Sequence, residues 1–237
     1  MNKFNEIFLD LERKILENEY PPQTLLPSEN QLIKIYGVSR ETIRKALNLL
    51  TNAGYIQKKQ GKGSIVLDLN RFDFPISGLT SYKELQQTQG IPSQTIVHTL
   101  EETVVPKKLS ELTGWSTDEV VWQLIRQRKI DGEIVILDKD YLVKSIIPKL
   151  PKERAADSIY DYFENDLQLE IAYAQKEITV ESASKEVQEL MELKENEPVV
   201  VIRSLVYLED TRCFEYTESI HRLDKFRFVE FARRRKV

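Results

Sequence analysis

The sequence has little of the chemistry on which disulfides, metal centres and phosphate loops depend. Its 237 residues include one cysteine, two histidines and eight glycines. The single cysteine, Cys213, excludes an intramolecular disulfide and fits a reducing compartment. So few scattered histidine and cysteine side chains argue against a metal site. No glycine-rich P-loop or Gly-x-Ser-x-Gly elbow occurs, so we expect no cofactor and no enzyme.

Long apolar runs are also missing, and none approaches the length of a membrane span. Acidic residues interrupt the apolar N-terminus at Glu6, Asp10 and Glu12, which is not the pattern of a signal peptide. We therefore expect a cytoplasmic protein without a membrane partner. The apolar residues of this segment recur at helical spacing and predict an amphipathic helix, with Phe4, Ile7, Phe8, Leu11 and Ile15 on one side.

The net charge of −4 hides an asymmetry between the two ends of the chain. Residues 1–70 contain ten Lys and Arg against eight Asp and Glu, whereas the remainder contains 24 against 30. Between Lys34 and Ser64 there are seven basic residues, and Glu41 is the only acidic one. A local excess of this kind is typical of a surface that meets a phosphate backbone.

Residues 26–65 have the pattern of two helices followed by a basic hairpin. Ser28 begins the first helix, and Gln31 three residues later makes a capping box. Gly37 ends this helix, and Ser39 caps a second one with apolar residues at helical spacing. Residues 60–63, Gln-Gly-Lys-Gly, then form a turn between two short strands. The pattern predicts a winged helix-turn-helix.

The first turn of the second helix is the part that offers base contacts. A helix in the major groove presents mainly its N-terminal residues, and Arg40, Thr42 and Arg44 lie there. In the wing, glycines allow a close approach to phosphates and Lys62 adds charge. The alternative is a helical hairpin with a solvated basic face. The combination of cap, basic first turn and glycine wing favours double-stranded DNA as the partner.

The segments LPSEN-x-L, GVSRETIRKAL and QGKGS resemble the winged helix of the GntR family of bacterial transcription regulators. The resemblance covers about the first seventy residues. It implies DNA contacts from seven residues: Ser39, Arg40, Thr42, Arg44, Gln60, Lys62 and Gly63. Many members have Arg directly after the P-S-E triplet, where this chain has Asn30. That departure predicts a shortened or lost contact to DNA.

The rest of the chain has long strand patterns separated by helices. Strands are predicted at 95–105, 119–130, 134–142, 170–182, 199–208 and 212–220, and helices at 82–89, 107–113, 152–164 and 184–193. This is an α+β arrangement with a mainly antiparallel sheet. The predicted domains are a winged helix-turn-helix at 1–70, a linker at 71–76 and an effector-binding and dimerisation domain at 77–237.

One predicted strand carries two arginines on a half-apolar face. Arg126 and Arg128 share a side of the strand with Trp122 and Leu124 because side chains alternate. Two buried guanidinium groups need an anionic partner, such as a phosphate or carboxylate ligand or a protein carboxylate. Asp138 on the next strand is the candidate protein partner, and a purely structural ion pair is the alternative.

The loop between these strands decides which residues meet. A two-residue Asp131-Gly132 loop pairs Arg126 with Leu137, whereas a three-residue loop ending at Glu133 pairs it with Asp138. A second anion site is predicted where Ser and Thr residues, including Thr80 and Ser81, precede a helix. Ser158 opens a similar helical turn, and a simple cap is its alternative role.

The C-terminal half resembles the UTRA effector domain of the HutC branch of the same family. The likeness rests on SGLTSY, RQRKIDGE, DSIYDYF and FEYTESIHRLDKFRF. It implies a fold like that of chorismate lyase. It also implies that Thr80, Ser81, Arg126, Arg128 and Ser158 hold a phosphate, and that Asp138, Glu215 and His221 lie on the sugar side. His221 stands where an aromatic Tyr is common, and Leu223 replaces a common glycine.

The leading hypothesis is a repressor that binds a palindromic operator as a homodimer and responds to a sugar phosphate. The SGLTSYKEL segment resembles family members that regulate trehalose operons, which implies trehalose 6-phosphate as the effector. Three alternatives stay open. They are an amino-sugar 6-phosphate as effector, a lyase-like enzyme, and a DNA-binding protein whose distal domain only dimerises.

Overall fold

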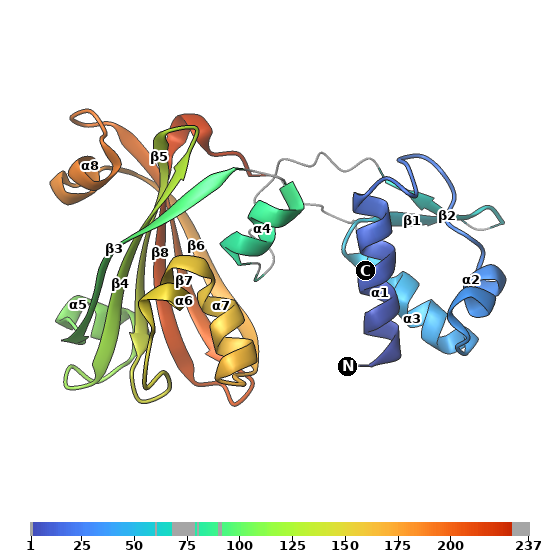
Figure 1. Ribbon diagram of the computed structural model, residues 1–237, viewed down its shortest axis with the longest axis horizontal. Coiled ribbons are helices and arrows are strands. Elements are labelled where there is room, and N and C mark those ends of the chain that lie inside the picture. The colour runs from blue at the N-terminus through green and yellow to red at the C-terminus, as the bar shows by residue number, and fades with distance from the viewer. Residues whose placement is uncertain (1, 60, 68–78, 80, 90–91, 229–237) are drawn as a thin grey trace. The chain divides into compact units, whose positions relative to one another are not determined.

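The computed structural model describes residues 2–59, 61–67, 79, 81–89 and 92–228. The chain divides into two compact units, whose elements are shown in Figure 1. The predicted linker at 71–76 lies outside the described residues, so the boundaries 1–70, 71–76 and 77–237 stay a prediction. Within the described ranges no helix is long and apolar enough to cross a bilayer.

The described residues of the N-terminal unit form three helices and a hairpin (Figure 1). The helices are α1 (Lys3–Leu16), α2 (Glu29–Tyr36) and α3 (Arg40–Asn52), and the hairpin strands are β1 (Ile56–Lys59) and β2 (Gly63–Val66). Helix α1 packs on α3 across one apolar core. It contributes Ile7, Leu11 and Ile15 to that core, all buried, which confirms the predicted amphipathic helix.

Serine caps set the start of both helices in the helix-turn-helix. The backbone N–H of Gln31 donates to Ser28 Oγ at 3.4 Å, and Ser28 N–H donates to Gln31 Oε1 at 2.8 Å. Helix α2 ends at Gly37, whose φ of +64° is left-handed. Helix α3 begins where the N–H of Thr42 donates to Ser39 Oγ at 3.2 Å. The predicted capping box and second cap are confirmed.

The hairpin that follows α3 is antiparallel, with Ile56 opposite Val66 and Lys59 opposite Gly63. Its turn requires glycine, because φ is +75° at Gly61 and +105° at Gly63, values that other residues rarely adopt. The hairpin completes the predicted winged helix-turn-helix.

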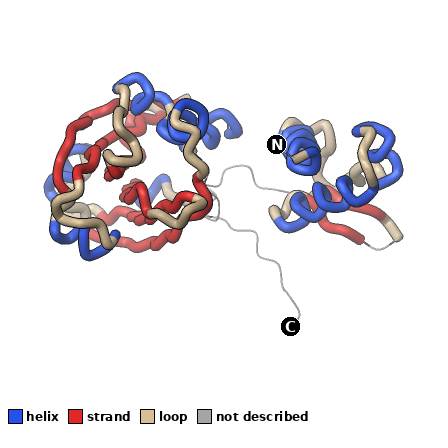
Figure 2. Tube along the Cα trace, turned by 90° about the horizontal axis from the view of Figure 1, so that it is seen from below, coloured by secondary structure: helices blue, strands red, loops and turns tan. Residues whose placement is uncertain are grey.

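A curved six-stranded antiparallel sheet forms the C-terminal unit (Figure 2). Its order is β3-β4-β5-β8-β7-β6, so β3 and β6 are the edge strands. The strands are β3 (Ser93–Val104), β4 (Val120–Ile130), β5 (Glu133–Val143), β6 (Ile171–Ser182), β7 (Pro198–Leu208) and β8 (Cys213–Arg222). The predicted α+β class with a mainly antiparallel sheet is confirmed.

Helices cover both faces of this sheet. On one face α6 (Lys152–Asp157), α7 (Ile159–Asp161) and a π-helical turn (Tyr162–Asp166) pack over a core that includes Leu124, Phe163 and Phe214. On the other face α5 (Lys107–Thr113) and α8 (Lys185–Met191) each cover a smaller apolar cluster. The remaining helical segments are α4 (Tyr82–Gln89) and a 3-10 turn (Leu223–Lys225).

The predicted continuous helix at 152–164 is wrong, because the chain breaks it at Ser158. This residue has extended backbone angles, φ −145° and ψ 116°, between α6 and α7. The extended conformation lets Ser158 Oγ accept a hydrogen bond from the N–H of Asp161 at 3.2 Å, which caps α7. The break turns the Ser158 side chain toward the sheet face on which α6 and α7 pack.

Candidate functional site

The residues predicted to contact DNA lie on α3 and the wing of the N-terminal unit. Ser39 caps α3, and Arg40, Thr42 and Arg44 occupy its first turns, with both arginines exposed. The hydroxyl groups of Ser39 and Thr42 lie 2.9 Å apart and share a hydrogen bond. Lys62 and Gly63 are exposed in the hairpin, and Gln60 lies outside the described residues.

Two side chains at the start of α2 contact these arginines. Arg40 Nη2 donates to Asn30 Oδ1 at 2.8 Å, and Arg44 Nε lies 3.7 Å from Glu29 Oε1. Asn30 stands where many family members have arginine, and here its amide oxygen holds the guanidinium of Arg40. Asn30, which was expected only to shorten or lose a contact to DNA, therefore orients the side chain of Arg40.

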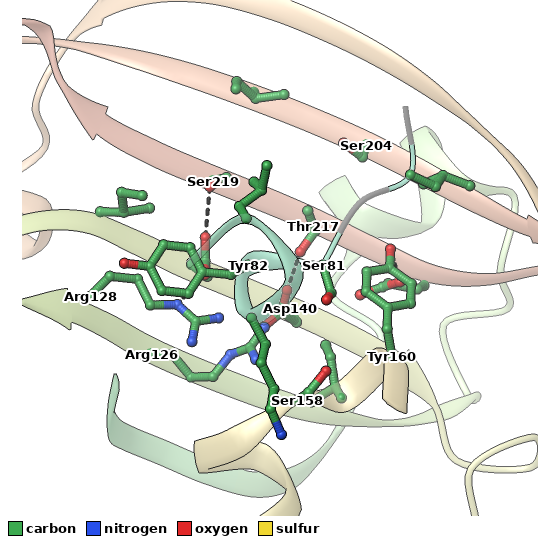
Figure 3. Close-up of a pocket in the computed structure, with 18 of the residues that line it drawn as sticks. Ser81, Tyr82, Arg126, Arg128, Asp140, Ser158, Tyr160, Ser204, Thr217 and Ser219 are labelled. Atoms are coloured by element: carbon green, nitrogen blue, oxygen red, sulfur yellow. Dashed lines mark hydrogen bonds and ion pairs between the residues drawn. The ribbon is translucent and has the colours of Figure 1, made fainter. Parts of the chain in front are cut away.

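A cavity of about 150 Å³, lined by charged, polar and apolar side chains, lies on the sheet face that α6 and α7 cover (Figure 3). Strands β4 to β8, helix α4 and the α6–α7 break all contribute to its lining. Seven of the eight residues predicted to bind the effector line it: Ser81, Arg126, Arg128, Asp138, Ser158, Glu215 and His221. The eighth, Thr80, lies outside the described residues.

The two arginines are buried, and each has its own aspartate. Arg126 Nη2 lies 2.7 Å from Asp140 Oδ2, and Arg128 Nε lies 2.9 Å from Asp138 Oδ2. Arg126 is 4% exposed and Arg128 2% exposed, so both charges depend on these partners. The predicted protein partner, Asp138, thus pairs with Arg128, whereas Arg126 pairs with Asp140, which was not predicted. Yet the buried Nε of Arg126 has no hydrogen-bond partner among the described residues, so this guanidinium still has a donor to offer.

The strand register behind these ion pairs depends on a β-bulge. Arg126 lies opposite Asp138, as one of the two predicted pairings has it. The loop, however, is the two-residue one, because Ile130 pairs with Glu133 across Asp131 and Gly132. The register then shifts by one residue at Val135, which has no partner on β4. The predicted pairing of Arg126 with Asp138 is therefore confirmed, but the three-residue loop from which it was predicted is wrong.

Arg128 ties three elements together at one end of the cavity. Its guanidinium lies 4.4 Å from the centre of the Tyr82 ring at the start of α4. Its Nη1 donates to Thr95 Oγ1 on β3 at 2.6 Å. Tyr82 and Arg128 lie together at one side in Figure 3. A change at this arginine would therefore be felt by α4 as well as by the cavity.

The two predicted serines are both buried helix caps that face the cavity. Ser81 Oγ accepts from the N–H of Glu84 at 3.2 Å, and the N–H of Ser81 donates to Glu84 Oε2 at 2.7 Å. The Glu84 carboxylate thus occupies part of the helix terminus where an anion was predicted. Ser158 caps α7 as described above, so its predicted alternative role as a cap is real and coexists with its place in the lining.

Glu215 is a buried carboxyl group in the middle of the lining. Burial, helped by the negative charge of Asp140, raises the pKa of Glu215 to about 8. Tyr160 Oη donates to Glu215 Oε2 at 3.0 Å, which joins α7 to β8. Because Glu215 is mainly protonated at neutral pH, it can donate as well as accept a hydrogen bond.

His221 lies deep in the cavity as a neutral side chain. Burial lowers its pKa to about 4. Its Nε2 lies 3.1 Å from Ser219 Oγ, and its ring meets the Phe226 ring edge-on at a centroid distance of 5.2 Å. Ser219 Oγ in turn donates to Asp138 Oδ1 at 2.6 Å. Part of the acceptor capacity of Asp138 is therefore used inside the protein.

Several cavity residues were not predicted from the sequence. They include Asp140, Tyr160, Lys176, Ser204, Thr217 and Ser219. Strand alternation carried a signal for some of them, since Asp140 shares a face with Asp138, and Thr217 and Ser219 share one with Glu215. Asp140 accepts a short hydrogen bond from Thr217 as well as the ion pair from Arg126. Lys176 and Ser204 could not be found in this way, because no residue of the predicted site lies on their strands.

Buried guanidinium groups, hydroxyls and a protonated carboxyl in one cavity suit a ligand that is both anionic and rich in hydroxyls. The winged helix and this cavity lie in separate units, which is the organisation of a ligand-responsive DNA-binding protein. Residues 3–66 match the family model "Bacterial regulatory proteins, gntR family", and residues 88–227 match "UTRA domain". The chain belongs to the GntR family of transcriptional regulators and carries a UTRA domain, so the lyase-like alternative is wrong.

The chain is similar to bacterial transcription regulators and to their solved structures. The HTH-type transcriptional regulator TreR of Bacillus subtilis is 49% identical over 236 residues, which cover 100% of this chain and 99% of that protein. The solved effector-binding domain of the B. subtilis trehalose repressor (TreR) has a TM-score of 0.56 at 49% identity, covering 60% of this chain and 99% of that chain. The crystal structure of the possible regulator YydK of B. subtilis has a TM-score of 0.81 at 26% identity, covering 98% of this chain and 100% of that chain.

Proposed function

We propose that this regulator is a repressor of a trehalose-utilisation operon and that trehalose 6-phosphate controls its binding to DNA. The observation that carries the proposal is the buried guanidinium group of Arg126, which belongs to the cavity lining and whose Nε has no hydrogen-bond partner among the described residues. An unsatisfied buried donor on a cation favours an anionic ligand. The similarity to TreR over the full chain supports trehalose as the sugar.

In this proposal the cavity has a phosphate side and a sugar side. Arg126, Arg128, Ser81 and Ser158, together with Thr80, hold the phosphate. Asp138, Glu215 and His221 meet sugar hydroxyls. The raised pKa of Glu215 and the lowered pKa of His221 support this division, because the neutral side chains can exchange hydrogen bonds with sugar hydroxyls.

The N-terminal unit reads the operator. The proposed contacts to DNA come from Ser39, Arg40, Thr42 and Arg44 on α3, and from Gln60, Lys62 and Gly63 in the wing. A homodimer would place two such units on the two halves of a palindromic operator.

Control of DNA binding by the effector is a linkage between two sites. The sugar phosphate must bind the DNA-free protein more tightly than the DNA-bound one, and operator DNA must weaken effector binding by the same factor. A coupling of about 1–3 kcal/mol corresponds to a change in affinity of roughly 5- to 150-fold.

The test measures operator affinity of the full chain at one fixed salt concentration, with and without saturating trehalose 6-phosphate. The operator is first obtained by selection from random duplexes. We expect the effector to weaken operator binding at least fivefold. An affinity that does not change with the effector would overturn the proposed control.

Two arginine variants separate sensing from general damage. Arg126→Lys keeps the charge beside Asp140 but loses the planar guanidinium, so the effector response should fall about tenfold or more. Arg203→Lys is the matched control, since Arg203 pairs with Glu181 and Glu218 and does not line the cavity. An equal response in both variants would remove Arg126 from the effector site, and no response in the unmodified chain would favour a distal domain that only dimerises.

An amino-sugar 6-phosphate is the second candidate effector. The phosphate side of the cavity would serve any sugar 6-phosphate, so the choice lies with the sugar side. Comparison of the melting temperature in trehalose 6-phosphate, glucosamine 6-phosphate and glucose 6-phosphate at equal concentration distinguishes them, because the tightest ligand gives the largest shift.

A further inference from the structure

The cavity continues beyond the residues considered so far, along one row of paired residues that crosses the sheet. Leu124 of β4 lies opposite Asp140 of β5, which lies opposite Thr217 of β8. Thr217 lies opposite Ser204 of β7, and Ser204 lies opposite Lys176 of the edge strand β6. The last four of these residues all line the cavity. The row therefore leads, without an apolar interruption, from the aspartate partner of Arg126 to a lysine on the far edge.

The two cationic ends of the cavity lie on the same face of the sheet but on strands far apart. Arg126 is on β4 and Lys176 is on β6, four strand spacings away, or about 19 Å along the sheet surface before curvature. In Figure 3 Arg126 and Arg128 lie on the side opposite to Tyr160 and Ser204. If the arginines hold a phosphate, the Lys176 end is therefore available to another part of the ligand.

The residues around Lys176 have the chemistry that recognises hydroxyl groups. An ammonium donates to hydroxyl oxygens, while Ser204 and Thr217 donate or accept. Tyr160 and Glu215, joined by a hydrogen bond of 3.0 Å, line the same cavity. Ile159 and Ile202 add apolar surface against which the C–H face of a sugar ring can pack.

We propose that Lys176, Ser204 and Tyr160 form a second sugar subsite, so that the cavity is built for a phosphorylated disaccharide rather than a phosphorylated monosaccharide. The subsite rests on the proposed function, because it takes the phosphate to lie at Arg126 and Arg128. It makes Lys176 a specificity-determining residue. A one-ring sugar phosphate reaches the arginine end alone, and the second ring of a disaccharide contacts the lysine end.

The test compares three probes on the full chain by calorimetry: trehalose 6-phosphate, glucose 6-phosphate and unphosphorylated trehalose. Lys176→Met removes the ammonium and keeps an unbranched apolar side chain. We expect it to weaken trehalose 6-phosphate binding by about 10- to 100-fold, the range for a lost hydrogen bond to a charged group. Binding of glucose 6-phosphate should stay within about twofold, which is within the usual scatter of such measurements.

The matched control is Lys139→Met, which removes a lysine from the central strand β5. Lys139 pairs with Glu186 of α8 on the opposite face of the sheet and does not line the cavity. This variant should bind all three probes as the unmodified chain does. Thermal unfolding of both variants reports their folding, and Lys176→Gln, which keeps a donor, replaces Lys176→Met if that protein does not fold.

The outcomes separate the subsite from the function on which it rests. Equal loss of both sugar phosphates in Lys176→Met, or no loss of either, would overturn the second subsite while leaving the sugar phosphate regulator intact. Failure of the unmodified chain to bind either sugar phosphate would overturn the proposed function, and the subsite with it. A selective loss of the disaccharide phosphate supports both.

Discussion

At the scale of single residues, Glu215 makes a prediction about stability and pH. Its pKa rises from 4.5 to about 8 on folding, so between these values the folded chain binds a proton that the unfolded chain lacks. Stability from this group is therefore present below pH 4.5 and is lost as the pH rises toward 8. The slope is at most about 1.4 kcal/mol for each pH unit.

Glu215→Gln removes this dependence, because the amide stays neutral at every pH. Urea unfolding of both proteins at several pH values should show the variant gaining stability relative to the unmodified chain between pH 4.5 and 8. His221, with a pKa near 4, acts in the opposite direction at pH 4 to 6.5 but is present in both proteins and cancels from the difference. Two parallel curves would show that Glu215 is not protonated in the fold.

Asn30 makes a second prediction at this scale. Asn30→Ala removes the amide oxygen that holds Arg40, so operator binding should weaken by about 1 kcal/mol, the value of one hydrogen bond. The base preference at the position read by Arg40 should also broaden, as measured by selection from random duplexes. Asn48→Ala is the control, because Asn48 holds Lys58 in the same way at 2.7 Å, away from the first turn of α3.

Sequence alternation was enough to find the arginine side of the cavity but not its other end. Arg126 and Arg128 stood out because two charges shared a strand face with apolar residues. Lys176 lies on an edge strand in which polar residues occupy both faces, so its direction depends on pairing with β7. The contact of Asn30 with Arg40 joins two helices and could not be read from either one alone.

At the scale of elements, the serine that breaks α6 from α7 has two roles that can be separated. Ser158→Ala should destabilise the chain by about 1 kcal/mol through loss of the α7 cap, and should also weaken sugar phosphate binding. Ser184→Ala is the matched control, because Ser184 caps α8 in the same way but does not line the cavity. Melting temperature measures the first effect and calorimetry the second. Equal effector affinity in the two variants would limit Ser158 to its structural role.

The bounds of a helix could be predicted from the sequence where the residues at its two ends determine them. Helix α5 has the predicted bounds, Lys107–Thr113, because a proline precedes it and Gly114 ends it with a left-handed φ of +76°. Prediction failed where a tertiary contact overrode the pattern. The bulge at Val135 and the break at Ser158 both place polar side chains in the cavity, and neither has a glycine or proline to mark it.

At the scale of the whole molecule, the charge asymmetry predicts different salt responses for the two ligands. Operator binding by exposed basic residues should fall about 10³- to 10⁵-fold between 50 and 200 mM salt if a dimer contacts roughly six to ten phosphates. Effector binding should change far less, because Arg126 and Arg128 are buried and poorly screened.

Lys62→Ala tests the wing within the same titration. Loss of one phosphate contact in each protomer should reduce the slope of log affinity against log salt by about two for a dimer. Fluorescence anisotropy at several salt concentrations gives the slope. An unchanged slope would remove Lys62 from the proposed contacts, and similar slopes for DNA and effector would contradict the separation of the two sites.

The row of residues from Asp140 to Lys176 has a consequence for how such regulators diversify. Its Arg126 end, where we propose that the phosphate binds, is fixed in the fold by two buried ion pairs on central strands, so substitutions there are costly. Its far end rests on β6, an edge strand with a neighbour on one side only. In the proposed site, mutations on β6 can therefore change the sugar that is recognised while the arginine end and the sheet stay in place. Regulators with this domain would then acquire new effector specificities through substitutions on the edge strand β6, while the buried arginines are retained.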